Sequence, residues 1–148
     1  MNLRRLTIAL AGVLALWAGF AVRVSAPPDR SDYRRTAVQA AESAHDAAGT
    51  GALVARTQLD GHAFGTFIAT AYDDAARTLS GAAKQIAEQA PRDDASARLR
   101  DEVLPLVQEA VRALGDASRA STEGALRAAL AALDDVAGKL GDIVDQYG

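Results

Sequence analysis

The stretch Leu126–Tyr147, LRAALAALDDVAGKLGDIVDQY, carries the strongest periodic signal in the chain. Large apolar residues recur every seven positions, and a second apolar series fills the alternate position, while most charged residues fall elsewhere on the helical wheel. This pattern predicts an amphipathic helix with the heptad packing of a coiled coil. The first series is Leu126, Leu133, Leu140 and Tyr147, and the second is Leu130, Ala137 and Val144.

Three further helical segments precede this stretch. Residues 32–59 predict a first helix and residues 64–90 a second, which Pro91 ends. A third helix begins where Asp93 or Asp94 accepts a backbone N–H bond as its cap. The expected core residues are Val38, His45, Ala52 and Leu59 with Ala41, Ala48 and Ala55; then Phe64, Ile68, Ala71, Ala75, Leu79, Ala82 and Ile86; then Leu99, Val103, Leu106, Ala110, Leu114 and Ala117.

Four places interrupt these segments. Gly49-Thr50-Gly51 weakens the first helix by roughly 1 kcal/mol per Gly relative to Ala, so a kink or break is expected there. Pro105 removes one backbone bond, and we expect the third helix to kink or restart at that point. Asp60-Gly61-His62 is a turn signal, and residues 115–122 form the last candidate turn.

Four amphipathic helices with short connections favour an all-α fold, an antiparallel up-down four-helix bundle over residues 32–148. No alternating, β-rich pattern competes with it. The composition agrees, because 35 of the 148 residues are Ala and only seven are aromatic. Such a chain builds closely packed helices around a thin core.

The beginning of the chain predicts a membrane anchor. A basic tail, residues 1–5, precedes an uncharged apolar run of 17 residues from Leu6 to Val22. At about 1.5 Å of rise per residue this run is near the lower limit for crossing a bilayer. We predict a single transmembrane signal-anchor helix over residues 6–24, a linker over 25–31, and an extracytoplasmic body at the cell membrane.

Two alternatives stay open for this segment. Val24-Ser25-Ala26 has the small residues of a signal-peptide cleavage site, although Pro27 follows it. Arg23 and the arginines after it make the downstream flank at least as basic as Arg4 and Arg5, which favours a cytoplasmic body. The short basic leader favours export.

The charge balance and the absence of cysteine exclude several functions. Removing Arg4, Arg5 and Arg23 from the 16 basic residues leaves 13 against 19 acidic residues, a net charge of −6 for the body. This balance argues against binding nucleic acid or anionic lipid through bulk charge. Without cysteine the chain has no disulfide, thiol nucleophile or Cys-based metal site.

The strongest metal candidate is Glu42-Ser43-Ala44-His45, which has the E-x-x-H spacing of di-iron bundles. A complete site needs a second such pair, and His62 has Leu59 rather than Glu three residues before it. His45 also falls on the apolar stripe, so a structural histidine is favoured.

The remaining acidic residues predict no catalytic or metal-binding site. Three pairs of adjacent acidic residues occur: Asp73-Asp74, Asp93-Asp94 and Asp134-Asp135. Neighbouring side chains on a helix point about 100° apart, so the two carboxylates of a pair do not converge on one ion. We expect one pair to be a helix cap and the other two to lie on solvated faces. No nucleophile elbow, phosphate loop or dinucleotide motif occurs. The chain is therefore predicted not to be an enzyme, with no catalytic, cofactor-binding or metal residues and no cofactor.

Two features suggest contacts with other chains. Ala11, Ala15 and Gly19 form a small-x-x-x-small ladder in the apolar run, which allows self-association into a homo-oligomer. Phe64, Phe67 and Tyr72 lie near one end of the second helix; Phe64 is expected in the core and the other two beside it, where they can shape a partner surface.

The layout resembles a known group of proteins. The basic start, single apolar span, lack of cysteine and Ala-rich body, with ARTQLDGHAFGTF inside residues 41–90, resemble uncharacterised small membrane-anchored, Ala-rich helical proteins of high-GC actinobacteria. The resemblance implies no activity and no functional residue. At fold level the bundle also resembles extracytoplasmic sensor domains of bacterial receptors.

The sequence thus predicts a non-catalytic, membrane-anchored scaffold or accessory subunit that binds another protein through a helix face. The alternative is an extracytoplasmic bundle that holds a small ligand near Gly49–Gly51 or Pro105. A metal-dependent oxidase built on Glu42 and His45 is a third, distant hypothesis.

Overall fold

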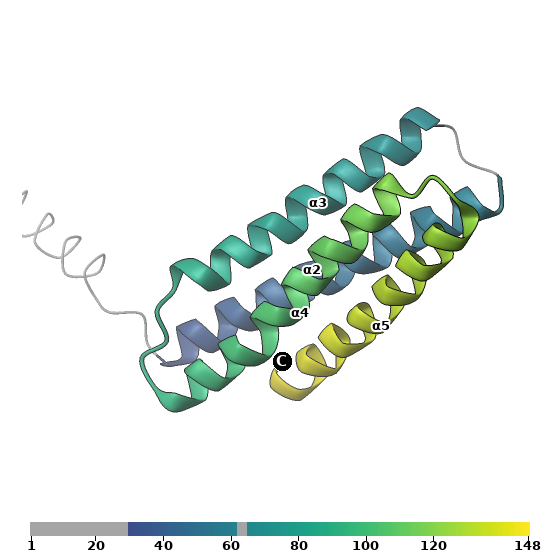
Figure 1. The fold of residues 1–148 in the computed structure, drawn as a ribbon. Coiled ribbons are helices and arrows are strands. Elements are labelled where there is room, and N and C mark those ends of the chain that lie inside the picture. The colour runs from purple at the N-terminus through teal and green to yellow at the C-terminus, as the bar shows by residue number, and fades with distance from the viewer. Residues whose placement is uncertain (1–29, 62–64) are drawn as a thin grey trace, which may run out of the picture.

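The computed structural model describes residues 30–61 and 65–148, which fold as an all-α four-helix bundle. Helix α2 spans Arg30–Leu59, α3 spans Gly65–Glu88, α4 spans Asp94–Arg119 and α5 spans Glu123–Tyr147. Successive helices run antiparallel and are joined by short connections (Figure 1). Among these elements none combines the length and apolarity that crossing a bilayer requires.

The helices form a ring in chain order. Helix α2 contacts α3 and α5, and α4 contacts the same two helices from the other side. Across the ring, α2 also lies close to α4, whereas the backbones of α3 and α5 stay farther apart. The proximal end of the bundle is the end at which α2 begins and α5 finishes, and the distal end is the one at which α2 finishes and α3 begins (Figure 1).

The expected tail 1–5, anchor 6–24 and most of the linker 25–31 lie outside the described residues, as do His62 and Phe64. The Ala11–Gly19 ladder lies outside them as well. The prediction of membrane anchoring therefore stays a prediction.

Local signals set the helix ends; the cap at Asp93 and the turn at Gly61 were predicted, whereas the cap at Thr122 was not. Asp93 caps α4, with its carboxylate accepting from the Ser96 N–H at 2.9 Å. Thr122 caps α5 by accepting from the Ala125 N–H at 3.2 Å. Gly61 adopts φ 70° in the turn after α2, a left-handed conformation that glycine reaches without strain.

At three places where a break, a restart or a turn was an expected outcome, the helices continue. Helix α2 continues through Gly49–Gly51, and α4 continues both through Pro105 and through Gly115 to Arg119. Proline removes only one backbone bond, and both ends of α4 pack against the other helices, so tertiary contacts outweigh the local defect. The connection between α4 and α5 is consequently shorter than predicted.

The core stripes of α3, α4 and α5 were largely predicted. Tyr72 is an addition, because it is 4% exposed and belongs to the core rather than beside it. Val107, which is fully buried, is another. Because α5 contacts both α2 and α4, it has a second apolar series beside the predicted one. The buried apolar residues of these three helices that the periodicity did not identify are Tyr72, Val107, Ala113, Ala129, Val136 and Ile143.

The stripe of α2 is only partly as expected: Ala41, Ala48, Ala52 and Ala55 are buried as predicted, whereas the larger residues of the expected stripe are not. Val38, His45 and Leu59 lie half-buried at the border, and the fully covered line runs through alanines and Gly51. Small side chains let α2 approach the other helices most closely, so the helix buries its smallest residues and leaves its larger ones at the edge. The buried residues of α2 are Tyr33, Ala37, Ala40, Ala41, Ala44, Ala47, Ala48, Gly51, Ala52, Val54 and Ala55.

Candidate interaction surface

His45 does not form a metal site with Glu42. Glu42 is exposed, whereas His45 is half-buried and its Nδ1 lies 2.8 Å from the carbonyl oxygen of Ala137 in α5. A carbonyl only accepts, so the ring nitrogen donates this bond. Within residues 30–61 and 65–148, no group of three or more His, Asp or Glu side chains is arranged to hold an ion. The arrangement supports a structural role for His45 at the α2–α5 contact.

The three acidic pairs are separated in space and in role. Asp93 is a helix cap, and the other pairs are exposed. Asp134 accepts from the Arg56 guanidinium with both oxygens, at 2.6 and 2.7 Å, and so links α5 to α2. Both side chains are about half exposed, so we expect this ion pair to contribute at most about 1 kcal/mol.

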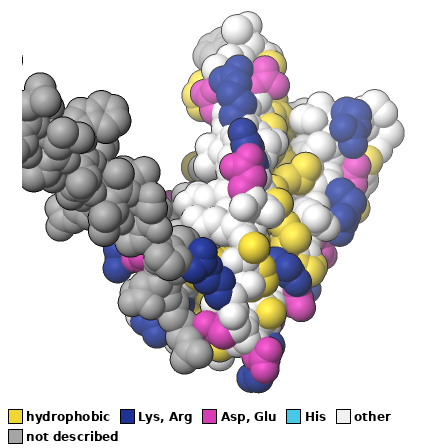
Figure 2. All heavy atoms as spheres, turned by 90° about the vertical axis from the view of Figure 1, so that its left-hand side faces the viewer, with side chains coloured by type: hydrophobic (Ala, Val, Ile, Leu, Met, Phe, Trp, Pro, Cys, Tyr) yellow, Lys and Arg dark blue, Asp and Glu magenta, His cyan; other side chains and the backbone are white. Residues whose placement is uncertain are grey.

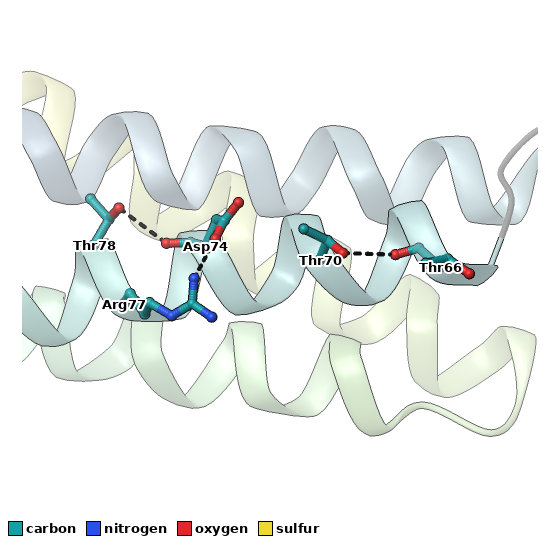
Figure 3. Close-up of polar contacts among 5 residues, drawn as sticks. All are labelled: Thr66, Thr70, Asp74, Arg77 and Thr78. Atoms are coloured by element: carbon teal, nitrogen blue, oxygen red, sulfur yellow. Dashed lines mark hydrogen bonds and ion pairs between the residues drawn. The ribbon is translucent and has the colours of Figure 1, made fainter.

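The outward face of α3 is polar, and its groups bond within the helix (Figure 3). The Thr70 hydroxyl donates to the Thr66 carbonyl at 3.0 Å, and the Thr78 hydroxyl to the Asp74 carbonyl at 3.1 Å. Arg77 pairs with the Asp74 carboxylate at 2.6 Å. These contacts leave this face as an ordinary solvated surface.

Of the two expected ligand positions, the one at Gly49–Gly51 has no room for a ligand beside Gly51. A Cβ added at Gly51 would lie 2.4 Å from Leu114 Cδ1, because the core already fills that space. A cavity of ≈ 220 Å³ lies instead at the distal end, between Leu59 at the end of α2 and Leu126 in α5. Its rim is Gln58, Ala120, Ser121, Thr122 and Glu123.

Tyr33 and Tyr72 are both buried core tyrosines, but their hydroxyls differ. The Tyr72 hydroxyl donates to Gln58 Oε1 at 3.4 Å. The Tyr33 hydroxyl is buried without a hydrogen-bond partner among the described residues. Burial raises the pKa of both hydroxyls above the ordinary 10.0, because the phenolate would lose its hydration.

Replacing Tyr33 by Phe is expected to raise the free energy of unfolding by about 1 kcal/mol, because a buried hydroxyl without a partner costs roughly 1–3 kcal/mol. Tyr72→Phe is the matched control and is expected to lower it by up to about 1 kcal/mol, since it removes a hydrogen bond. Urea titration followed by circular dichroism measures both. A loss in Tyr33→Phe as large as that in Tyr72→Phe would contradict the assignment.

Stability is also expected to fall as the pH rises above about 10. The raised pKa of Tyr33 and Tyr72 means that the folded state keeps these protons after the unfolded state has lost them. The contribution of these two tyrosines to the free energy of unfolding is therefore complete below pH 10 and is lost as the pH passes their folded-state pKa. Melting temperatures between pH 8 and 11 test this, and the Tyr33→Phe/Tyr72→Phe double variant should lose less over that range.

One apolar strip stays uncovered on the flank of α4 that faces α3. Glu102 lies on the opposite flank of α4 and accepts a hydrogen bond from the Tyr147 hydroxyl of α5 at 3.1 Å. That flank therefore faces α5. Leu104 and Val111 lie seven residues apart on the α3 side; Leu104 is half-buried and Val111 is 39% exposed. Sequence analysis did not identify them, although an i, i+7 apolar pair outside the core stripe was a usable signal.

Helix α3 carries small apolar residues beside its core stripe. Ala76 is exposed and Ala83, seven residues later on the same side of α3, is half-buried against the core. We call Ala76, Ala83, Leu104 and Val111 the α3–α4 seam. Figure 2 shows hydrophobic side chains gathered in a hollow between α3, at the top, and the α4–α5 side of the bundle, at the right.

Helix α3 is less deeply buried near the distal end. On the core-facing stripe of α3, Leu79 and Ile86 are buried, but Ile68, one turn from the helix start, is only half-buried. Phe67 beside it is 61% exposed. Leu53, the other large exposed apolar residue, stands alone on the outward face of α2. The seam is thus the part of the described surface where apolar side chains gather.

No known protein family, curated protein or solved structure is significantly similar to this chain. The assignment of a function therefore depends on its own residues.

Proposed function

We propose that this chain is a non-catalytic interaction module, a scaffold or accessory subunit held at the cell membrane by residues 6–24, with its helical bundle outside the cytoplasm. The observation that carries the proposal is the α3–α4 seam, where Val111 is 39% exposed and Leu104 is only half-buried against the core. Scattered apolar residues are normal on a protein surface, whereas a gathered strip in a hollow suits a binding partner.

The partner that fits is a protein helix with an apolar stripe. The seam runs between two antiparallel helices and its four defining residues carry no charge, so a third helix laid along it buries apolar side chains on both partners. The part of α3 that carries Thr70, Asp74 and Arg77 is polar and offers no comparable surface. The sequence supports the location, through its basic start and the apolar run Leu6–Val22.

The first test is mass spectrometry of the full-length protein purified from membranes in mild detergent. A mass that begins near Met1, together with a stoichiometric partner protein, supports the anchored subunit. A mass that begins at Pro27, without a partner, overturns the anchor. It would favour the alternative function, an exported bundle that binds a small ligand.

Val111→Glu is expected to reduce recovery of that partner about tenfold or more. A carboxylate brought into an apolar contact loses its hydration, and tenfold corresponds to only about 1.4 kcal/mol. Leu53→Glu is the matched control, because Leu53 is more exposed but lies on the outward face of α2. The measurement is quantitative co-purification, with circular dichroism to show that both variants fold. Equal recovery from both variants would overturn the seam as the docking surface.

A further inference from the structure

We draw no further inference here: the strongest candidate, the cavity of ≈ 220 Å³ between the end of α2 and the start of α5, is rimmed by mostly exposed side chains around one helix N-terminus, and nothing in the described residues shows what would occupy it.

Discussion

Leu114→Ala is expected to lower the free energy of unfolding by about 2–5 kcal/mol. Leu114 is 2% exposed and its side chain lies over Gly51, where α4 crosses the bundle to meet α2. Truncation removes three buried carbon atoms from this contact and leaves a cavity, since helices tied to other neighbours can close it only in part. For a domain whose total stability is typically about 5–15 kcal/mol, this is a large fraction.

The measurement is urea denaturation of the full-length protein and the variant, followed by far-UV circular dichroism. Val111→Ala is the control on the same helix, because Val111 is 39% exposed and should lose much less. A Leu114→Ala loss no larger than that of Val111→Ala would show that α4 does not pack on α2 as described.

Gly51→Ala is expected to lower the free energy of unfolding by about 1–2 kcal/mol, although alanine is the better helix former. The added Cβ would lie 2.4 Å from Leu114 Cδ1 and 3.4 Å from Leu133 Cδ1. Leu133 is fully buried and Leu114 nearly so, so neither side chain has free space to move into. Overpacking then outweighs the gain in helix propensity.

Gly49→Ala is the matched control, two residues away in the same helix. A Cβ at Gly49 meets nothing within 4 Å, so only the propensity gain of about 0.5–1 kcal/mol remains and the sign reverses. Combining Gly51→Ala with Leu114→Ala removes the clashing atom, and the two effects should be less than additive. If Gly51→Ala stabilises the protein as much as Gly49→Ala does, the close approach of α2 and α4 is wrong.

The same pair of glycines shows why the break expected in α2 does not occur. From the sequence, Gly49 and Gly51 are equivalent weak points, and a break is the reasonable expectation. In the bundle, Gly49 is exposed, while Gly51 is buried against Leu114. The cost of glycine in a helix is about 1 kcal/mol, and burial of the surrounding alanines and leucines exceeds it.

The sequence predicted the buried residues of some helices better than those of others. In α3 and α5, large residues such as Leu79 and Leu133 alternate with charged ones, so the hydrophobic difference between faces is large and the prediction was mostly correct. In α2, alanines occupy several faces, and the heptad through Val38 and His45 looked as apolar as the true one. The buried face was chosen by how closely α4 and α5 can approach, a property of pairs of helices.

The α3–α4 seam, too, was only partly predictable from the sequence. Leu104 and Val111 are visible in the sequence as apolar residues off the main stripe. Whether α3 covers them depends on how α3 sits against α4, and the sequence of α4 carries no information on that. The half-buried Ile68 and the hollow in Figure 2 come from the packing of α3 alone, which touches α2 and α4 but not α5.

The sequence by itself determined the four helices, the cap at Asp93 and the all-α bundle, because these depend on local hydrogen bonding and on apolar spacing within one segment. Only the tertiary structure decided that α2 buries its alanines and leaves Val38 and His45 at the border, that α4 runs unbroken through Pro105, and that the α3–α4 seam stays open. Each of these depends on the fit between side chains of different helices, which the order of residues along one helix does not specify.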